Sequence, residues 1–191
     1  MFSGIIQDIG KIVSIQKINN FSRVLIKSKI TKNKLGSSVC CSGICLTVTS
    51  IKNKNTFSVD VSPETLKKTN AYKWCKGMEI NIEKSLKLGD EISGHFVFGH
   101  IDNVGKLKSI KKISNCWLIK VNYKKNLKKF IAQKGSISLN GVSLTINKVI
   151  SNYMELMLIP HTFKNTTFKN IKPDDLINIE VDMLARYSLN K

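Results

Sequence analysis

The sequence is poor in arginine. Lysine and arginine together number 31 against 13 acidic residues, which gives a net charge of +18, yet only Arg23 and Arg186 are arginines. Nucleic-acid interfaces typically combine arginine with interleaved aromatic residues that stack on bases, and that pattern is missing here. Lysine accompanies abundant asparagine and isoleucine, residues that share A/T-rich codons, so genome composition is a sufficient cause of the charge. We expect no nucleic-acid partner. A basic nucleic-acid-binding barrel remains a rival, which a steep salt dependence of DNA binding would support.

Long apolar runs are also missing. No stretch approaches the roughly 18 residues that cross a bilayer, and the segment from Met1 lacks the basic and apolar regions of a signal peptide. The sequence therefore predicts a cytoplasmic protein with no membrane partner.

The cysteines offer no recognisable pairing or metal motif. There are five of them, an odd number, without a Cys-x-x-Cys spacing, so they are expected to be thiols in a reducing compartment. Cys40, Cys41 and Cys45 have no histidine nearby, and the three histidines lack carboxylates at ligand spacing. No metal site is expected.

What the sequence does contain is a long internal repeat. Residues 4–11 (GIIQDIGK) recur as residues 99–106 (GHIDNVGK), and residues 43–48 (GICLTV) recur as residues 141–146 (GVSLTI), 95 to 98 residues later. The segments SPETLK and IPHTFK, then two copies of INIE, follow in the same order. This period is too long for a solenoid unit, which recurs every 20 to 50 residues. The repeat predicts a duplicated domain.

Each repeat has the pattern of an all-β domain. Short runs alternate apolar and polar residues, as where Ile80 and Ile82 alternate with Asn81 and Glu83, and this period of two predicts half-buried antiparallel strands. Many short strands in each repeat favour a small closed barrel, since closure removes exposed edges. The predicted domains are an N-terminal barrel over residues 1–92, a C-terminal barrel over residues 93–185 and a tail over residues 186–191.

Three short helices are expected between the strands. Ser62 can cap a helix that begins at Pro63, and the equivalent helix of the second repeat begins at Pro160. A third, amphipathic helix is predicted over residues 124–133, with Leu127, Phe130 and Ile131 facing inward.

The strand after each repeated glycine carries candidate chemistry. Residues two apart on a strand face the same way, so Cys45 and Thr47 share one face, and Ser143 and Thr145 share the equivalent face of the second repeat. Threonine on an exposed strand face needs no functional explanation. The exchange of a thiol for a hydroxyl, however, suggests a division of labour, and His100 stands where the first repeat has isoleucine.

Several motifs together resemble one known family. Glycine-rich phosphate loops, hydrolase elbows and dinucleotide fingerprints are absent, which disfavours phosphoryl transfer and nicotinamide chemistry. Residues 1–6, 43–48, 93–100, 140–145 and 158–162, in this order, closely resemble the alpha-chain type of the riboflavin synthase family. The match extends from Met1 to about Asp182.

The resemblance implies a fold, a reaction and an assembly. It implies two tandem six-stranded antiparallel Greek-key barrels with short helices, each binding one 6,7-dimethyl-8-ribityllumazine. It implies the last step of riboflavin biosynthesis, in which one lumazine gives a four-carbon unit to another, yielding riboflavin and 5-amino-6-ribitylamino-pyrimidinedione, without metal or cofactor. It also implies a homotrimer, with each site between the N-terminal barrel of one subunit and the C-terminal barrel of its neighbour.

The resemblance further implies the site residues. The catalytic candidates are Cys45, as nucleophile or polarising thiol, His100 for proton handling, and the polar groups Ser143, Thr145, Asp182, Ser38 and His95. A first pocket is expected to be lined by Gly4, Ile5, Ile6, Cys45, Leu46, Thr47, Asp60, Val61, Ser62, Pro63, Glu64 and Thr65. A second is expected to be lined by Gly99, His100, Ile101, Lys134, Ser143, Leu144, Thr145, Met157, Leu158, Ile159, Pro160, His161 and Thr162.

The sequence departs from the family pattern at three places. Ser42 stands where asparagine is usual and His161 where glutamate is frequent, so different ligand contacts are expected at those turns. The chain stops at Lys191, where relatives continue into a helix that helps to hold the trimer. The main rival to the enzyme is a lumazine- or flavin-binding antenna protein of the same fold.

Overall fold

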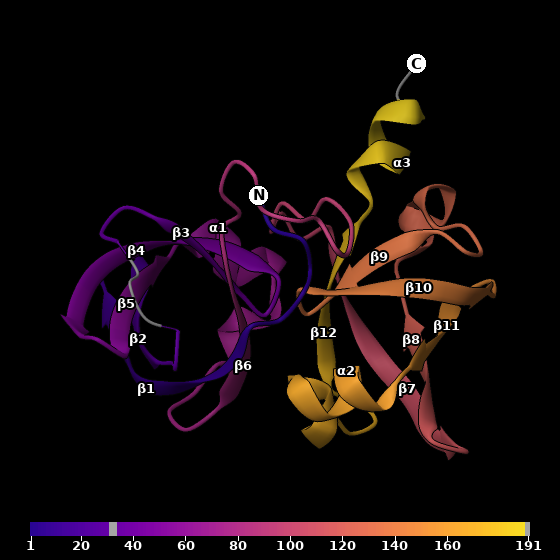
Figure 1. The fold of residues 1–191 in the computed structure, drawn as a ribbon, viewed down its shortest axis with the longest axis horizontal. Coiled ribbons are helices and arrows are strands. Elements are labelled where there is room, and N and C mark those ends of the chain that lie inside the picture. The colour runs from indigo at the N-terminus through magenta and orange to yellow at the C-terminus, as the bar shows by residue number, and fades with distance from the viewer. Residues whose placement is uncertain (31–33, 190–191) are drawn as a thin grey trace.

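The chain folds into two closed antiparallel β-barrels that lie side by side, as the computed structural model shows for residues 1–30 and 34–189 (Figure 1). The strands of the first barrel are β1 (Asp8–Ile18), β2 (Phe21–Lys27), β3 (Ser38–Cys41), β4 (Ile44–Asn53), β5 (Thr56–Val61) and β6 (Glu79–Lys84). Those of the second are β7 (Asn103–Ile113), β8 (Cys116–Asn122), β9 (Ser136–Leu139), β10 (Val142–Val149), β11 (Tyr153–Leu158) and β12 (Leu176–Val181). Both barrels have the same circular strand order, which confirms the predicted fold and duplication.

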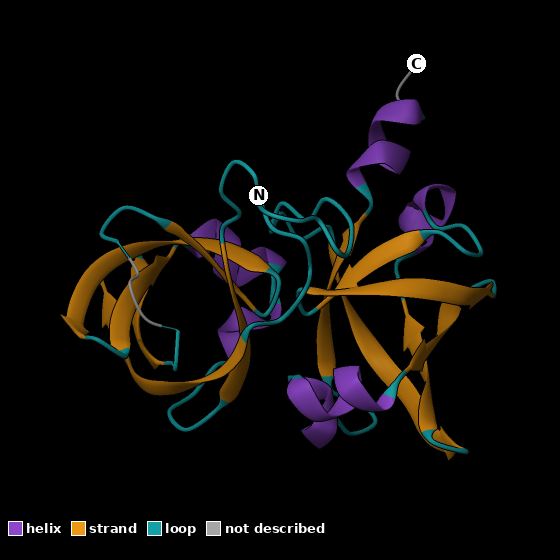
Figure 2. Ribbon diagram, viewed as in Figure 1, coloured by secondary structure: helices purple, strands orange, loops and turns teal. Residues whose placement is uncertain are grey.

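Short helices lie in connections between strands and after the last strand (Figure 2). They are α1 (Pro63–Lys68), η1 (Asn70–Lys73), η2 (Lys125–Phe130), α2 (Pro160–Asn165), η3 (Thr167–Asn170) and α3 (Met183–Ser188), the η elements being 3-10 helices. The predicted cap of α1 is confirmed, because the Ser62 hydroxyl accepts a hydrogen bond from the Thr65 backbone N–H at 3.1 Å. None of the helices in the described ranges is long and apolar enough to span a bilayer.

The helix predicted over residues 124–133 is shorter and tighter than expected. It is the 3-10 helix η2, and the chain becomes extended at Ile131 so that it can enter β9. Leu127 and Ile131 are buried as predicted, and Phe130 is half-buried against the core of the second barrel. Lys124 offers no side-chain cap.

Each barrel has its own apolar core. Ile26, Phe57 and Ile82 are among the fully buried side chains of the first, and Leu107 and Ile119 are among those of the second. The cores occupy the barrel interiors, so any ligand must bind to an outer face.

The two barrels are joined by a pseudo-symmetric seam of hydrogen bonds. Asn178 of β12 donates through Nδ2 to the Ser42 carbonyl (2.9 Å) and accepts through Oδ1 from the Asn70 N–H (2.7 Å). Asn81 of β6 makes the equivalent bonds to the Asn140 carbonyl (2.9 Å) and the Thr167 N–H (2.8 Å).

This seam corrects one prediction. Asn81 and Glu83 were expected on a solvated strand face, but their relative exposures are 0% and 1%. The second barrel covers that face, so β6 is buried on both sides. Equivalent residues Asn178 and Glu180 of β12 are buried for the same reason.

Candidate functional site

The predicted polar residues of the first barrel lie together on the outer face of the β3–β4 hairpin. Ser38 of β3 is the register partner of Thr47 of β4, and Cys45 lies two residues before Thr47 on the same face. Leu46, between them, points into the core and is 5% exposed. The thiol and the two hydroxyls therefore form one polar strip along the barrel wall.

A segment that leads into the second barrel crosses this strip. The Cys45 N–H donates to the Gly99 carbonyl at 3.0 Å, and Ile101 packs against the core of the first barrel. Gly99 has φ +79°, and a Cβ there would lie 2.5 Å from the Cys45 backbone nitrogen, so only glycine permits this approach. His100 follows Gly99 directly and is exposed.

The second barrel has the equivalent arrangement. Ser143 and Thr145 lie on the outer face of β10, and the Ser143 N–H donates to the Gly4 carbonyl at 2.8 Å. Ile6 packs against the core of the second barrel. The segment that precedes the first strand of each barrel therefore packs against the outer face of the other barrel.

This exchange corrects the expected grouping of pocket residues. Gly4 and Ile6, predicted to line the pocket of the first barrel, lie against the second, and Gly99 and Ile101 lie against the first. The remaining predicted segments stay with their own barrels: Asp60 to Thr65 joins β5 to α1, Met157 to Thr162 joins β11 to α2, and Lys134 precedes β9.

Within those segments, not every side chain faces outward. Val61 and Leu158 are fully buried in the two cores, and Leu144 is 9% exposed, so only their backbone atoms can meet a ligand. Ile159 is 55% exposed. Lys134 is exposed and has φ 68°, a left-handed conformation that costs a non-glycine residue about 1–2 kcal/mol.

Two buried carboxylates that the sequence did not single out hold the exchanged segments. Glu180 of β12 accepts hydrogen bonds from the N–H groups of Phe98 (2.8 Å) and Gly99 (2.9 Å). Glu83 of β6 accepts from the Ser3 N–H (2.8 Å) and the Gly4 N–H (3.0 Å). The signal that could have found them is the repeated Ile-Asn-Ile-Glu segment, because an acidic residue recurs at the same place in both halves.

Burial raises the pKa of both carboxyl groups, although the N–H donors act in the opposite direction. A carboxyl with a raised pKa in the folded state holds its proton more tightly there than in the unfolded chain. Its stabilising contribution is complete below the ordinary carboxyl pKa and is lost as the pH rises through the raised value.

We therefore expect a pH effect from Glu83→Gln combined with Glu180→Gln. The free energy of unfolding of the parent chain should fall, relative to that of the double variant, as the pH rises from 4 through the raised pKa values. Urea unfolding at several pH values measures this difference. Glu64→Gln is the matched control, because the Glu64 side chain is 72% exposed. Parallel curves for the parent and the double variant would contradict the prediction.

His95 and Ser143 form a close pair in the second barrel. Nδ1 of the imidazole lies 2.7 Å from the Ser143 hydroxyl oxygen. Burial lowers the pKa of His95, and the charge of Asp182 opposes this shift. A neutral imidazole can exchange a proton with the hydroxyl, so this pair is a candidate for proton transfer. Asp182 also caps α3 by accepting from the Leu184 N–H at 2.9 Å.

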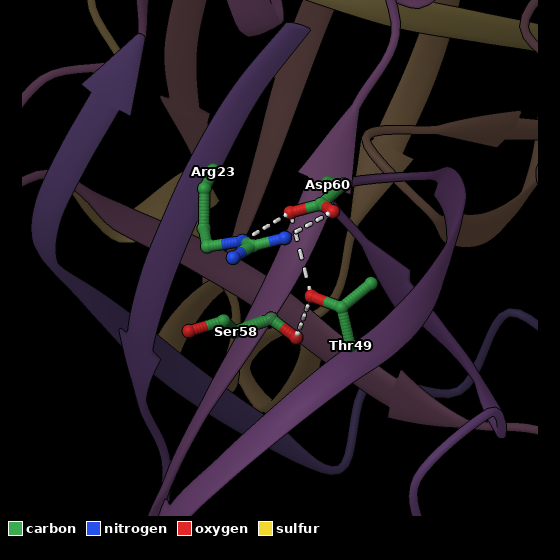
Figure 3. Close-up of polar contacts among 4 residues, drawn as sticks. All are labelled: Arg23, Thr49, Ser58 and Asp60. Atoms are coloured by element: carbon green, nitrogen blue, oxygen red, sulfur yellow. Dashed lines mark hydrogen bonds and ion pairs between the residues drawn. The ribbon is translucent and has the colours of Figure 1, made fainter. Parts of the chain in front are cut away.

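Asp60 is committed to an ion pair (Figure 3). Its two carboxylate oxygens accept from Nε and Nη2 of Arg23 at 2.7 and 2.8 Å, and the Thr49 hydroxyl points toward the same carboxylate. The hydrogen bonds from Arg23 hold the pKa of Asp60 below its ordinary value. Asp60 is therefore anionic at neutral pH, and its main contacts fix the end of β5.

The predicted site is distinct from a cavity of about 770 Å³ between the barrels. That cavity is lined by Asn70, Trp74, Glu79, Asn140 and Asp175, among others, and by none of the predicted site residues. Within residues 1–30 and 34–189, no group of three or more histidine, cysteine or acidic residues is placed to hold a metal ion.

Comparison with known proteins gives the family. A family model described as the lumazine binding domain matches residues 3–85 and again residues 98–182. Riboflavin synthase from Brucella abortus (strain 2308) is 40% identical over 194 residues, covering 98% of this chain and 96% of the relative. Riboflavin synthase from Bacillus subtilis (strain 168) is 39% identical over 189 residues, covering 98% and 87%. This chain belongs to the riboflavin synthase family.

Solved structures agree on the architecture of this family member. The crystal structure of LumP complexed with 6,7-dimethyl-8-(1'-D-ribityl) lumazine superposes with a TM-score of 0.84 at 21% identity, covering 95% of this chain and 99% of that one. The riboflavin complex of LumP gives a TM-score of 0.86 at 22% identity. These likenesses establish the fold.

The family departure at Ser42 lies in the seam, away from the predicted ligand contacts. The Ser42 hydroxyl accepts from the Asn81 N–H at 3.2 Å, as the Asn140 side chain accepts from the Asn178 N–H at 2.8 Å in the other repeat. A serine therefore serves the seam as an asparagine does. His161 lies exposed on α2, where its carbonyl accepts from the Asn165 side chain.

Proposed function

We propose that this chain is a riboflavin synthase, which converts two molecules of 6,7-dimethyl-8-ribityllumazine into riboflavin and 5-amino-6-ribitylamino-pyrimidinedione. The observation that carries the proposal is the pair of equivalent outer faces, one on each barrel. Each face is bordered by a glycine-containing segment that leads into the other barrel. Synthase relatives at 34% to 40% identity across nearly the whole chain support it. A reaction between two identical substrates needs two similar binding faces.

The two faces differ where the two substrates must play different parts. The first has the Cys45 thiol, and the Cys45 N–H is bonded to the Gly99 carbonyl directly before His100. The second has the Ser143 hydroxyl against His95. The reaction requires a base to remove a proton from the C7 methyl group of one lumazine and a nucleophile, thiolate or water, to add to C7 of the other. Cys45 and His100 are our candidates on the first face, and Ser143, His95 and Asp182 on the second. Orientation of the two ring systems supplies much of the rate.

We further propose that the working unit is a homotrimer in which the first face of one subunit meets the second face of a neighbour. α3 supports this proposal, because it projects away from the second barrel (Figure 1) and carries apolar side chains with high exposure. Leu184 is 66% exposed and Tyr187 is 72% exposed. A second copy of the chain would cover them.

The decisive test is an assay of riboflavin formation from the lumazine without additives. The parent protein should produce riboflavin, and Cys45→Ser or His100→Ala should slow the reaction about 10²- to 10⁴-fold, the usual contribution of a positioned acid, base or nucleophile. Cys75→Ser is the matched control, since Cys75 is exposed and lies between η1 and β6, outside the predicted site residues.

Two further results of the same assay separate the alternatives. Stoichiometric lumazine binding without turnover would favour the antenna protein and contradict the enzyme proposal. Activity per chain should fall on dilution if the site forms between subunits. Activity that is independent of protein concentration down to a measured monomer would contradict the shared site.

A further inference from the structure

Cys40 and Cys45 lie directly opposite each other on the β3–β4 hairpin. The two strands are joined by a tight turn at Ser42 and Gly43, which have φ 46° and 86°. Cys41 is therefore the register partner of Ile44, and Cys40 is the register partner of Cys45. Both thiols belong to the outer face, while Cys41 points into the core of the first barrel.

The hydrogen bonds between β3 and β4 show which type of antiparallel pair Cys40 and Cys45 form. The Val48 N–H donates to the Ser37 carbonyl at 2.9 Å, so a hydrogen bond between the two strands falls at this register position. Paired positions of an antiparallel ladder alternate, which makes Cys40 and Cys45 a non-hydrogen-bonded pair. The Cys45 N–H agrees, because it turns away from the hairpin and donates to Gly99.

This pairing has the backbone separation of a disulfide. Directly opposite residues of a non-hydrogen-bonded pair have Cα atoms about 4.5 Å apart, with their side chains close together. A disulfide spans Cα separations of about 4.4 to 6.8 Å. The backbone can therefore accept the bond without a rearrangement of the hairpin.

The second barrel has the same geometry with different chemistry. Ser138 is the register partner of Ser143, and the Ser143 N–H again turns away to a glycine carbonyl. Two hydroxyls cannot be joined by oxidation. The first repeat thus differs from the second at both members of one pair, and the two changes together create an oxidisable site.

We propose that Cys40 and Cys45 form a reversible disulfide when the protein meets a hydroperoxide. The Cys45 thiolate attacks the peroxide, breaking the O–O bond, and becomes a sulfenic acid while the oxidant leaves as water or an alcohol. The Cys40 sulfur then attacks the Cys45 sulfur, which forms the S–S bond and breaks the S–O bond, and the departing hydroxide takes the Cys40 proton and leaves as water. Two thiols lose two hydrogens and the hydroperoxide is reduced.

Burial assigns the order of the two steps. Cys45 is partly exposed and meets the oxidant, whereas Cys40 is 1% exposed beneath Phe2 and Val97. The bond removes the Cys45 thiol, so under the proposed function it switches off riboflavin formation.

The test uses the full chain treated with equimolar hydrogen peroxide and then unfolded with a thiol-blocking maleimide. Mass spectrometry of the parent should show the loss of two hydrogens in the peptide that contains Cys40 and Cys45, with two of the five cysteines unblocked, and dithiothreitol should restore both thiols. Cys40→Ser should form no such bond, and its Cys45 should instead gain oxygen atoms. Cys41→Ser and Cys116→Ser should form the bond as the parent does.

The outcomes separate this proposal from the proposed function. Blocking of all five cysteines after treatment, or a bond that persists in Cys40→Ser, would overturn the disulfide. A bond that forms, reverses with dithiothreitol and leaves riboflavin formation unchanged would support the disulfide and overturn the role of Cys45. Joint loss and recovery of the thiols and the activity supports both.

Discussion

Gly99→Ala is expected to reduce riboflavin formation at least about 100-fold, the effect of a misplacement of about 1 Å at a reacting centre. A Cβ at this position would lie 2.5 Å from both Cβ and the backbone nitrogen of Cys45. Movement of Cys45 is opposed by the β3–β4 pairing, in which Cys45 is the register partner of Cys40. The segment that carries His100 must move instead, and it would take its N–H groups away from Glu180.

The same substitution should also lower stability. A non-glycine residue in the left-handed region costs roughly 1–2 kcal/mol, and an extra methyl group in a tightly packed contact typically costs about 1–3 kcal/mol. Urea unfolding measures the sum, and the riboflavin assay measures the displacement of His100 from Cys45.

Gly89→Ala is the control that separates backbone strain from steric contact. Gly89 has φ +91°, and nothing lies within 4 Å of a Cβ built there. This variant should show the strain alone and keep its activity. Gly4→Ala should resemble Gly99→Ala, because its Cβ would lie 2.6 Å from Ser143 Cβ. If Gly99→Ala were as active as Gly89→Ala, the exchanged segment would not be part of the site.

The faces of individual strands could be predicted from the sequence because side-chain direction is a local property. The alternation around Cys45 and Thr47 places these residues on the outer face of β4, and the same holds for Ser143 and Thr145 on β10. The repeat added the equivalence of the two hairpins. These observations were enough for two similar closed barrels, while the six strands of each barrel were implied by the family resemblance.

The partner of each leading segment could not be predicted in this way. Gly4 and Gly99 have the same local sequence pattern whichever barrel they cover, since the choice depends on how the barrels dock. The roles of Glu83 and Glu180 could not be predicted for a related reason. A carboxylate on the polar side of a strand looks solvated until a second barrel buries it, and only then do its N–H partners come within reach.

The substitution Asn178→Ala, in the seam between the barrels, should cause a large loss of stability. The Asn178 side chain is fully buried and is bonded to the Asn70 N–H and the Ser42 carbonyl. Removal of the amide leaves the Ser42 carbonyl, in a buried residue, and the N–H of the half-buried Asn70 without these bonds, and each unsatisfied group costs about 1–3 kcal/mol. The free energy of unfolding should therefore fall by roughly 2–6 kcal/mol. Asn53→Ala, in an exposed turn where Asn53 accepts from the Asn55 N–H, is the control and should change it little.

Loss of this seam should reach the site as well. Ser42 and Gly43 form the turn that leads into β4, and a Cβ at Gly141 would lie 2.8 Å from the Gly43 nitrogen, so the two hairpin turns are in direct contact. Loosening the barrels displaces β4, with Cys45, relative to the Gly99 segment, which belongs to the other barrel. Asn178→Ala should thus lose activity at urea concentrations at which it is still folded. If its activity persisted up to its unfolding midpoint, as expected for Asn53→Ala, the alignment of Cys45 with Gly99 would not depend on the seam.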